Sequence, residues 1–155
     1  MNYQDWQKTV SEEITKDPLW TLEAYKMGLF ISEIGWHDVK ALNKNSLTKP
    51  LANQLIRALD SISANIAEGY SRSTGKDRAR FYEYSLGSAR ESRDWYYKAR
   101  RVLREEVVEH RMALLTQIIK MLNALVPKQR QKGIREEQAN YETLSQGLTT
   151  NIPMP

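Results

Sequence analysis

Two consecutive stretches decide the fold of this chain: residues 51–69, LANQLIRALDSISANIAEG, and residues 78–104, with the turn 70–77 between them. The apolar residues of the first stretch, spaced 4, 3 and 4 along the sequence, are Leu55, Leu59, Ile62 and Ile66. This spacing places them on one face of a helix. Small or apolar residues flank that face, which is typical of a helix buried on more than one side. Gly69 then offers a C-cap position that can take positive φ.

The second stretch contains a heptad-like seam, which predicts the buried face of another helix. Its members, spaced alternately by 4 and 3, are Phe81, Ser85, Ser88, Ser92, Trp95, Ala99 and Val102. The middle of the helix is small (Gly87, Ser88, Ala89), so we expect another helix backbone to approach closely at Ser88. Thr74 with Asp77 resembles a capping box and predicts where this helix begins.

Two more helices are expected on either side of this pair. One should run from Asp17-Pro18 to about Asn43. Its predicted buried face is Leu22, Tyr25, Leu29, Ser32, Trp36 and Val39. The other should span about Val107 to Val126, where Pro127 ends or kinks it. Its predicted face is Val108, Met112, Leu115, Ile119, Leu122 and Val126. Four helices with short connections predict an all-α, up-down-up-down four-helix bundle.

Length and composition indicate one domain with tails. The 155 residues divide into an N-terminal arm or short helix (1–16), the bundle (17–127) and a basic segment with a C-terminal tail (128–155). The net charge is +4, a mild basic bias. The absence of cysteine excludes disulfides and thiolate metal sites. The start of the chain lacks an apolar signal core, and no stretch approaches membrane-spanning length, so we expect a cytoplasmic protein with no membrane partner.

A family resemblance becomes specific across this helix pair. It is carried by residues 61–69 (SISANIAEG), Arg72, Arg80-Phe81, Gly87-Ser88-Ala89 and Glu91. These residues resemble the bacterial four-helix bundle protein family, first noticed as reading frames inside intervening sequences of large-subunit ribosomal RNA genes. The family is related to accessory proteins of diversity-generating retroelements. The resemblance implies a homopentameric barrel and, in the retroelement relatives, a basic oligomer that binds a reverse transcriptase and its RNA.

No catalytic constellation is present in the sequence. A two-metal carboxylate site in a bundle core needs two Glu-x-x-His pairs, but this chain has only His37 and His110, and Glu33 lies four residues before His37. The serines lack a Gly-x-Ser-x-Gly elbow, and there is no phosphate-cradling glycine loop. We therefore expect no enzyme activity, no metal and no cofactor.

Basic residues give the clearest indication of a partner. With Ser88 at the centre of the buried face, five arginines fall on the opposite face with Tyr97 among them. Together with the preceding turn, the predicted nucleic-acid-binding residues are Arg72, Lys76, Arg78, Arg90, Arg93, Tyr97, Arg100, Arg101 and Arg104. Arginines with an interleaved aromatic can contact phosphates and stack on a base. A solvated surface explains the same pattern, because Glu83 and Asp94 border the arginines.

Two functional hypotheses follow. The first is a non-enzymatic, homo-oligomeric scaffold that binds RNA or DNA, with a reverse transcriptase as a further candidate partner. The second is a structural bundle that binds another protein through Trp95-Tyr96-Tyr97. Under either hypothesis, residues that set helix register and subunit contacts are expected to be Arg57, Ser61, Asn65, Glu68, Ser88 and Glu91. The small and apolar circumference of the helix at 51–69 predicts the closed oligomer, and the resemblance implies that it is a pentamer.

Overall fold

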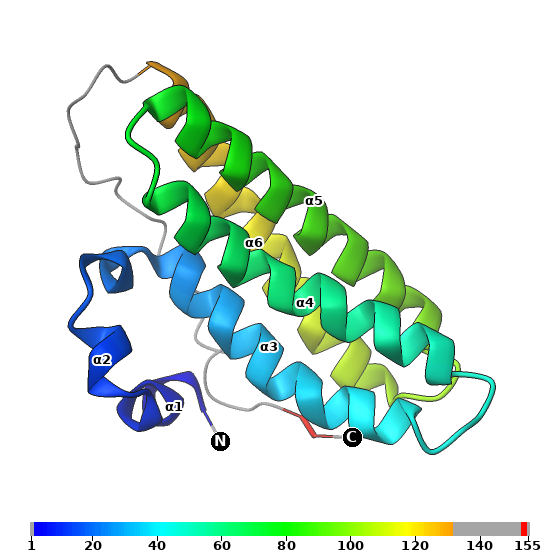
Figure 1. Cartoon of the computed structure of the whole chain (residues 1–155). Helices are drawn as coiled ribbons and strands as arrows, with labels where there is room; N and C mark the ends of the chain where they lie inside the picture. The colour runs from blue at the N-terminus through cyan, green and yellow to red at the C-terminus, as the bar shows by residue number, and fades with distance from the viewer. Residues whose placement is uncertain (1, 132–152, 155) are drawn as a thin grey trace.

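A computed structural model describes residues 2–131 and 153–154. All regular structure in these ranges is helical, as the sequence predicts. Four long helices, α3 (Glu23–Leu42), α4 (Lys49–Tyr70), α5 (Gly75–Ala99) and α6 (Glu105–Gln131), run side by side in Figure 1. Each packs on the next in sequence, and α6 also contacts α3, so the helices enclose one core. The fold is a helical bundle.

Three short helical segments precede the bundle, namely α1 (Tyr3–Thr9), α2 (Glu12–Thr15) and the 3-10 helix η1 (Pro18–Thr21). They lie along the flank of α3 (Figure 1). The α1 side chains of Tyr3 and Trp6 are buried, and their ring centroids lie 5.0 and 5.1 Å from that of Phe30 on α3. The Tyr3 hydroxyl donates to Glu23 at 2.6 Å. The segment 1–16 therefore contributes to the core through two aromatic rings.

The predicted helix ends are only partly correct. Asp17 does accept a hydrogen bond from the Leu19 amide at 2.8 Å, but it caps η1, and α3 begins at Glu23. Thr74 caps α5 as expected, accepting from the Asp77 amide at 3.1 Å. Pro127 does not end the last helix, because α6 continues through it to Gln131. Pro127 is exposed and lies in the last turn of the described helix, where few backbone hydrogen bonds depend on it.

The buried face of α3 is not the predicted one. Of the predicted residues only Val39 is buried, and Trp36 is 56% exposed. The observed face consists of Ala24, Met27, Gly28, Phe30, Ile31, Ile34, Gly35, Asp38, Val39 and Leu42. The glycines explain the orientation, because a Cβ at Gly28 would lie 3.1 Å from Ile62 on α4. The side of α3 that carries its glycines is therefore packed closely against α4.

The buried face of α5 is also rotated from the prediction. Ser85, Ser92 and Ala99 are buried as predicted, but Ser88 is only half-buried. The observed face consists of Ala79, Tyr82, Ser85, Leu86, Ala89, Ser92, Tyr96 and Ala99. Tyr96 is fully buried, which the prediction had placed at an exposed aromatic end. Nothing lies within 4 Å of a Cβ built on Gly87, so none of the helices within residues 2–131 approaches closely there.

The faces of α4 and α6 agree better with the sequence. All four predicted apolar residues of α4 are fully buried. On α6 every residue of the predicted face is buried except Met112, which is half-buried. The predicted C-cap role of Gly69 is wrong. Gly69 lies within α4, and no glycine among the described residues has positive φ. A Cβ there would lie 2.8 Å from the Tyr82 ring and 2.9 Å from Phe81 Cβ. Gly69 therefore allows α4 and α5 to approach each other, rather than reversing the chain.

Candidate nucleic-acid interface

The basic residues near the α4–α5 turn are held in place by local contacts. Arg78 donates from Nε to the Arg72 carbonyl at 2.7 Å. The Arg72 guanidinium forms an ion pair with Glu68 and lies over the Phe81 ring, 4.5 Å from its centroid. Lys76 is exposed in the first turn of α5. Because Glu68 neutralises Arg72, the field of this turn is weaker than its number of basic residues suggests.

A second group of basic residues surrounds the α5–α6 connection. Tyr97 is 52% exposed, and the Arg100 guanidinium lies over its ring at 3.7 Å from the centroid. Arg100 also donates from Nη1 to the Tyr97 carbonyl at 2.6 Å, which fixes the stacked geometry. Arg101 is exposed beside it. Arg104 is different, because it is ion-paired with Glu106 and donates to the Met154 carbonyl.

These two groups do not form one continuous stripe. At 1.5 Å per residue, the 25 residues of α5 separate the two helix ends by roughly 36 Å. Between them Arg90 is exposed, but Arg93 is half-buried and donates to Thr116 on α6 at 3.2 Å. The prediction that Arg93 points away from the core is therefore wrong, for the same reason that the α5 face is rotated. The structure shows two basic groups at opposite ends of α5.

The six residues predicted to set register and subunit contacts lie at or near the surface of α4 and α5. Arg57, Glu68 and Glu91 are exposed, whereas Ser61, Asn65 and Ser88 are half-buried. The polar groups are satisfied along their own helices: Asn65 donates to the Ser61 carbonyl at 2.8 Å, and Ser88 to the Tyr84 carbonyl at 3.0 Å. Neither glutamate points into the core, and each has a partner on the surface of its own helix or the turn that follows it. Glu68 pairs with Arg72, and Glu91 accepts from the Trp95 indole at 3.1 Å.

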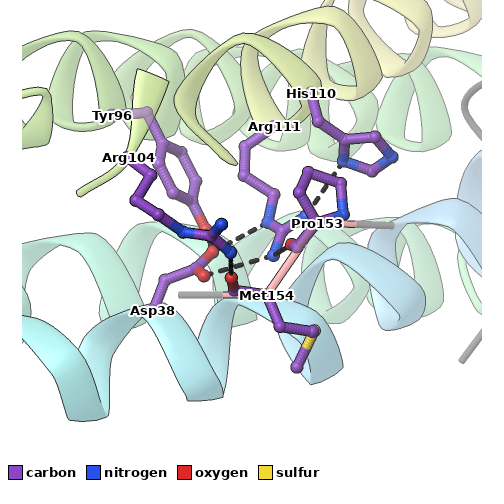
Figure 2. A network of polar contacts seen from close by, with 7 residues as sticks. All are labelled: Asp38, Tyr96, Arg104, His110, Arg111, Pro153 and Met154. Atoms are coloured by element: carbon purple, nitrogen blue, oxygen red, sulfur yellow. Dashed lines mark hydrogen bonds and ion pairs between the residues drawn. The ribbon is translucent and has the colours of Figure 1, made fainter. Parts of the chain in front are cut away.

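The most deeply buried polar group was not predicted from the sequence. Arg111 on α6 has no exposed side-chain surface, and it donates from Nε to Asp38 Oδ2 at 2.8 Å and from Nη2 to Asp38 Oδ1 at 3.2 Å. Tyr96 on α5 donates its hydroxyl to the same carboxylate at 2.7 Å, and His110 Nδ1 lies 3.0 Å from Arg111 Nη1. Figure 2 shows these side chains converging from three helices. The network joins α3, α5 and α6.

Burial dominates the electrostatics of this network. It raises the pKa of Tyr96 well above the ordinary value, and the neighbouring Asp38 charge adds to that shift while Arg111 opposes it. The phenol therefore stays protonated and serves as a donor to Asp38. Helical spacing could have revealed the network, because Asp38 lies four residues after Ile34 and four before Leu42, and Arg111 lies four before Leu115. A charged residue in register with an apolar stripe on two helices indicates a buried pair.

A groove separates the N-terminal helices from the exposed side of α3 and α4. Its lining includes Trp6, Val10, Leu29, Trp36 and Ile56, together with the carboxylates of Glu33 and Asp60. Three residues of the predicted α3 face, Leu29, Ser32 and Trp36, line this groove and are not among the buried core residues. No cluster of three or more metal-ligating side chains occurs within residues 2–131 and 153–154. Within the same ranges, no helix is both long and apolar enough to cross a bilayer.

Residues 22–124 of the chain match the family model of the 23S rRNA-intervening sequence proteins. The chain belongs to this family. The match covers α3, α4, α5 and most of α6, and leaves α1, α2 and η1 outside it. No curated protein gives a significant match. The region shared with the 23S rRNA-intervening sequence protein family is therefore the bundle, and the N-terminal helices lie outside that region.

Proposed function

We propose that this protein is a non-enzymatic, cytoplasmic scaffold that binds the backbone of RNA or DNA through the α5–α6 connection. The supporting observation is the exposed Tyr97–Arg100 stack beside Arg101. Arg72, Arg104 and Arg130 each pair with a glutamate, but within the described residues no carboxylate lies at ion-pair distance from Arg100 or Arg101. Unpaired guanidiniums beside an accessible ring are suited to phosphate contact and base stacking. The family description is compatible with an RNA-associated role.

We further propose that the bundle has up-down-up-down topology and assembles into a closed homo-oligomer, with five subunits as the expected number. The half-buried surface at Ser61, Asn65 and Ser88, with open space beyond Gly87, supports a contact with a second copy. A ring would repeat each Tyr97–Arg100–Arg101 group around its axis, so weak individual contacts would add. The resemblance to retroelement accessory proteins makes a reverse transcriptase a further candidate partner.

The test compares two double variants with equal loss of charge. Arg100→Gln with Arg101→Gln removes the unpaired group, whereas Arg72→Gln with Arg130→Gln removes two glutamate-paired arginines at the other end of α5. RNA affinity is measured as a function of salt. The first variant should flatten the salt slope by about one unit per lost phosphate contact, and the second should change it less. A first variant that binds like the parent at low salt contradicts the proposal.

Stacking is tested separately with Tyr97→Ala and Tyr97→Phe. The alanine variant should weaken single-stranded RNA about tenfold or more, because base–aromatic stacking contributes roughly 1–3 kcal/mol per base. The phenylalanine variant keeps the ring and should bind like the parent. Duplex RNA, whose bases are already stacked, should be bound equally by all three proteins.

A protein-interaction role is favoured by a different observation, the exposure of Trp36 beside the groove against α1 and α2. An exposed tryptophan near apolar residues is a typical anchor for another protein chain. Replacing Trp36 with Ala would abolish such binding and leave RNA affinity unchanged, so the two functions are separable in one set of variants.

A further inference from the structure

Two consecutive backbone carbonyls near the end of the chain meet two arginines of the bundle. The carbonyl oxygen of Pro153 accepts from Arg111 Nη2 at 2.8 Å, and that of Met154 accepts from Arg104 Nη2. Figure 2 shows Pro153 and Met154 lying against the Asp38–Arg111 network, with the two guanidiniums turned toward them. The contacts join positions 42 and 50 residues apart in sequence.

On the bundle side of this contact, the Arg111 guanidinium is already held in place by other hydrogen bonds. Arg111 is wholly buried, and Asp38 and His110 engage its Nε, Nη1 and Nη2 groups. These bonds fix the plane of the guanidinium, so the direction of the remaining Nη2 N–H toward Pro153 is set before any peptide arrives. Arg104 adds a second donor from the α5–α6 connection, where Glu106 holds it by an ion pair.

The sequence of the occupant is complementary to a site made only of donors. Residues 152–155 read Ile-Pro-Met-Pro, and the two prolines have no backbone N–H. The segment therefore offers mainly carbonyl acceptors, and arginine side chains offer only donors. A residue before proline is restricted to extended or polyproline conformations, so Met154 loses less conformational entropy on docking than an ordinary residue would.

We propose that Arg104 and Arg111 form a receptor site for an extended, proline-containing peptide, and that its ligand is the chain's own Ile-Pro-Met-Pro segment. The site binds two successive main-chain carbonyls. It prefers peptides with proline at alternate positions to other peptides, because those peptides offer mainly acceptors and are already extended. This role is separate from nucleic-acid binding and does not depend on it. It assigns Arg104 to peptide recognition, in contrast to its sequence-based assignment to a phosphate-binding surface.

The experiment uses a variant that ends at Asn151 and a synthetic peptide, Thr-Asn-Ile-Pro-Met-Pro, with an amidated carboxyl end so that no added carboxylate pairs with the arginines. Binding is followed through the side-chain Nε–H resonance of Arg111 in ¹⁵N spectra. The truncated protein should take up one peptide per chain with a saturable shift of this resonance toward its position in the full chain. A peptide with alanine at both proline positions should bind at least tenfold more weakly.

Matched variants locate the site. Arg104→Gln in the truncated protein should weaken the peptide about tenfold, as expected for loss of one charge-assisted hydrogen bond. Arg101→Gln, an equal change in charge in the same connection, should leave affinity unchanged. In the full-length chain, Arg104→Gln should shift the Met154 amide resonance and Arg101→Gln should not, a comparison that does not require the truncated protein to fold. An Arg111 resonance that is identical in truncated and full-length protein, or equal effects of the two variants, would overturn the proposal.

Discussion

Asp38 and Arg111 form a bidentate ion pair across the bundle, with Nε 2.8 Å from Oδ2, and neither side chain has any exposed surface. The pair joins α3 to α6, the first and last long helices of the described bundle. Taking both charges out of water carries a large desolvation cost, which good geometry and further hydrogen bonds must offset. Here Tyr96 and His110 supply those hydrogen bonds. The pair therefore specifies how the helices fit together more than it adds net stability.

Removing one member of this pair should destabilise the fold strongly. Arg111→Met leaves the Asp38 charge buried with only Tyr96 as a donor, and should lower the free energy of unfolding by roughly 3–5 kcal/mol. Adding Asp38→Asn removes the uncompensated charge but keeps an acceptor for Tyr96, so most of the loss should be recovered. Urea unfolding of the two single variants and the double variant measures the coupling. Additive losses in the double variant would mean that the pair does not act as a unit.

The buried Tyr96 hydroxyl should make the fold sensitive to alkaline pH. The raised pKa of Tyr96 means that on unfolding the phenol returns to an ordinary pKa near 10. Above about pH 10 the unfolded state therefore holds fewer protons than the folded state, and the free energy of unfolding falls as pH rises. Tyr96→Phe should flatten this decline, and should cost roughly 1–3 kcal/mol at pH 7 through the lost hydrogen bond to Asp38.

Urea midpoints between pH 7 and pH 11 test this prediction. The exposed Tyr97→Phe serves as the control and should change neither the midpoint at pH 7 nor its slope with pH. Part of the decline should persist in Tyr96→Phe, because burial and Glu23 also raise the pKa of Tyr3. An unchanged slope in Tyr96→Phe would show that Tyr96 does not contribute to the alkaline transition.

Replacement by alanine should change the stability of the protein in opposite directions at two glycines on neighbouring helices. Gly69→Ala places a methyl group 2.9 Å from Phe81 Cβ, and this overpacking should cost roughly 1–3 kcal/mol, more than the helix propensity gained. Gly87→Ala meets nothing within 4 Å and should stabilise α5 by about 1 kcal/mol. Thermal unfolding separates the two outcomes. A Gly87→Ala variant that melts earlier would indicate that a second copy packs closely at this position.

Assembly can be tested through Ser88, which is half-buried and follows Gly87, where an added Cβ would meet no atom of the described residues within 4 Å. Light scattering should give a mass several times the 18.0 kDa of one chain. Ser88→Arg should reduce that mass toward one chain without changing the helical content, because the larger side chain blocks contact between copies while the bundle core is untouched. A parent protein that scatters as a monomer at micromolar concentration would refute the oligomer.

Sequence periodicity predicted the helices and two of their four faces. It succeeded for α4 and α6, where apolar residues recur regularly on one side. It failed for α3 and α5 because each buries a residue that the prediction had left out of the core, Asp38 and Tyr96, and because an apolar residue of each predicted face is exposed, Trp36 and Val102. A pattern that counts only apolar residues leaves out polar side chains that satisfy one another across helices, although Asp38 and Arg111 do stand at the helical spacing of the apolar residues around them. The error on α5 carried over to Arg93, which the rotated face brings beside Thr116.

The candidate sites were less predictable than the fold. The stacking of Arg100 on Tyr97 follows from the spacing of three residues, and a sequence-based argument placed both residues on one surface. The contact of Pro153 with Arg111 has no such local origin, since it depends on where residues 153–154 meet the bundle. The ion pair that neutralises Arg72 is local, because Glu68 lies four residues before it in the sequence, and Arg104 lies two residues before its partner Glu106.

Asp38 and Arg111 are 73 positions apart in the sequence, and this separation imposes an order on biosynthesis. A ribosome adding about 5–20 residues per second needs roughly 4–15 s to make Arg111 after Asp38 has been polymerised. Tyr96, which follows Asp38 by 58 residues, leaves the ribosome ahead of Arg111 and can reach the carboxylate before the arginine has emerged. A nascent α3–α4–α5 intermediate would thus carry an uncompensated negative charge at its centre, and only the arrival of α6 would neutralise it. Closure of the bundle is therefore coupled to completion of its last long helix, so a chain stalled before Arg111 cannot adopt the native core.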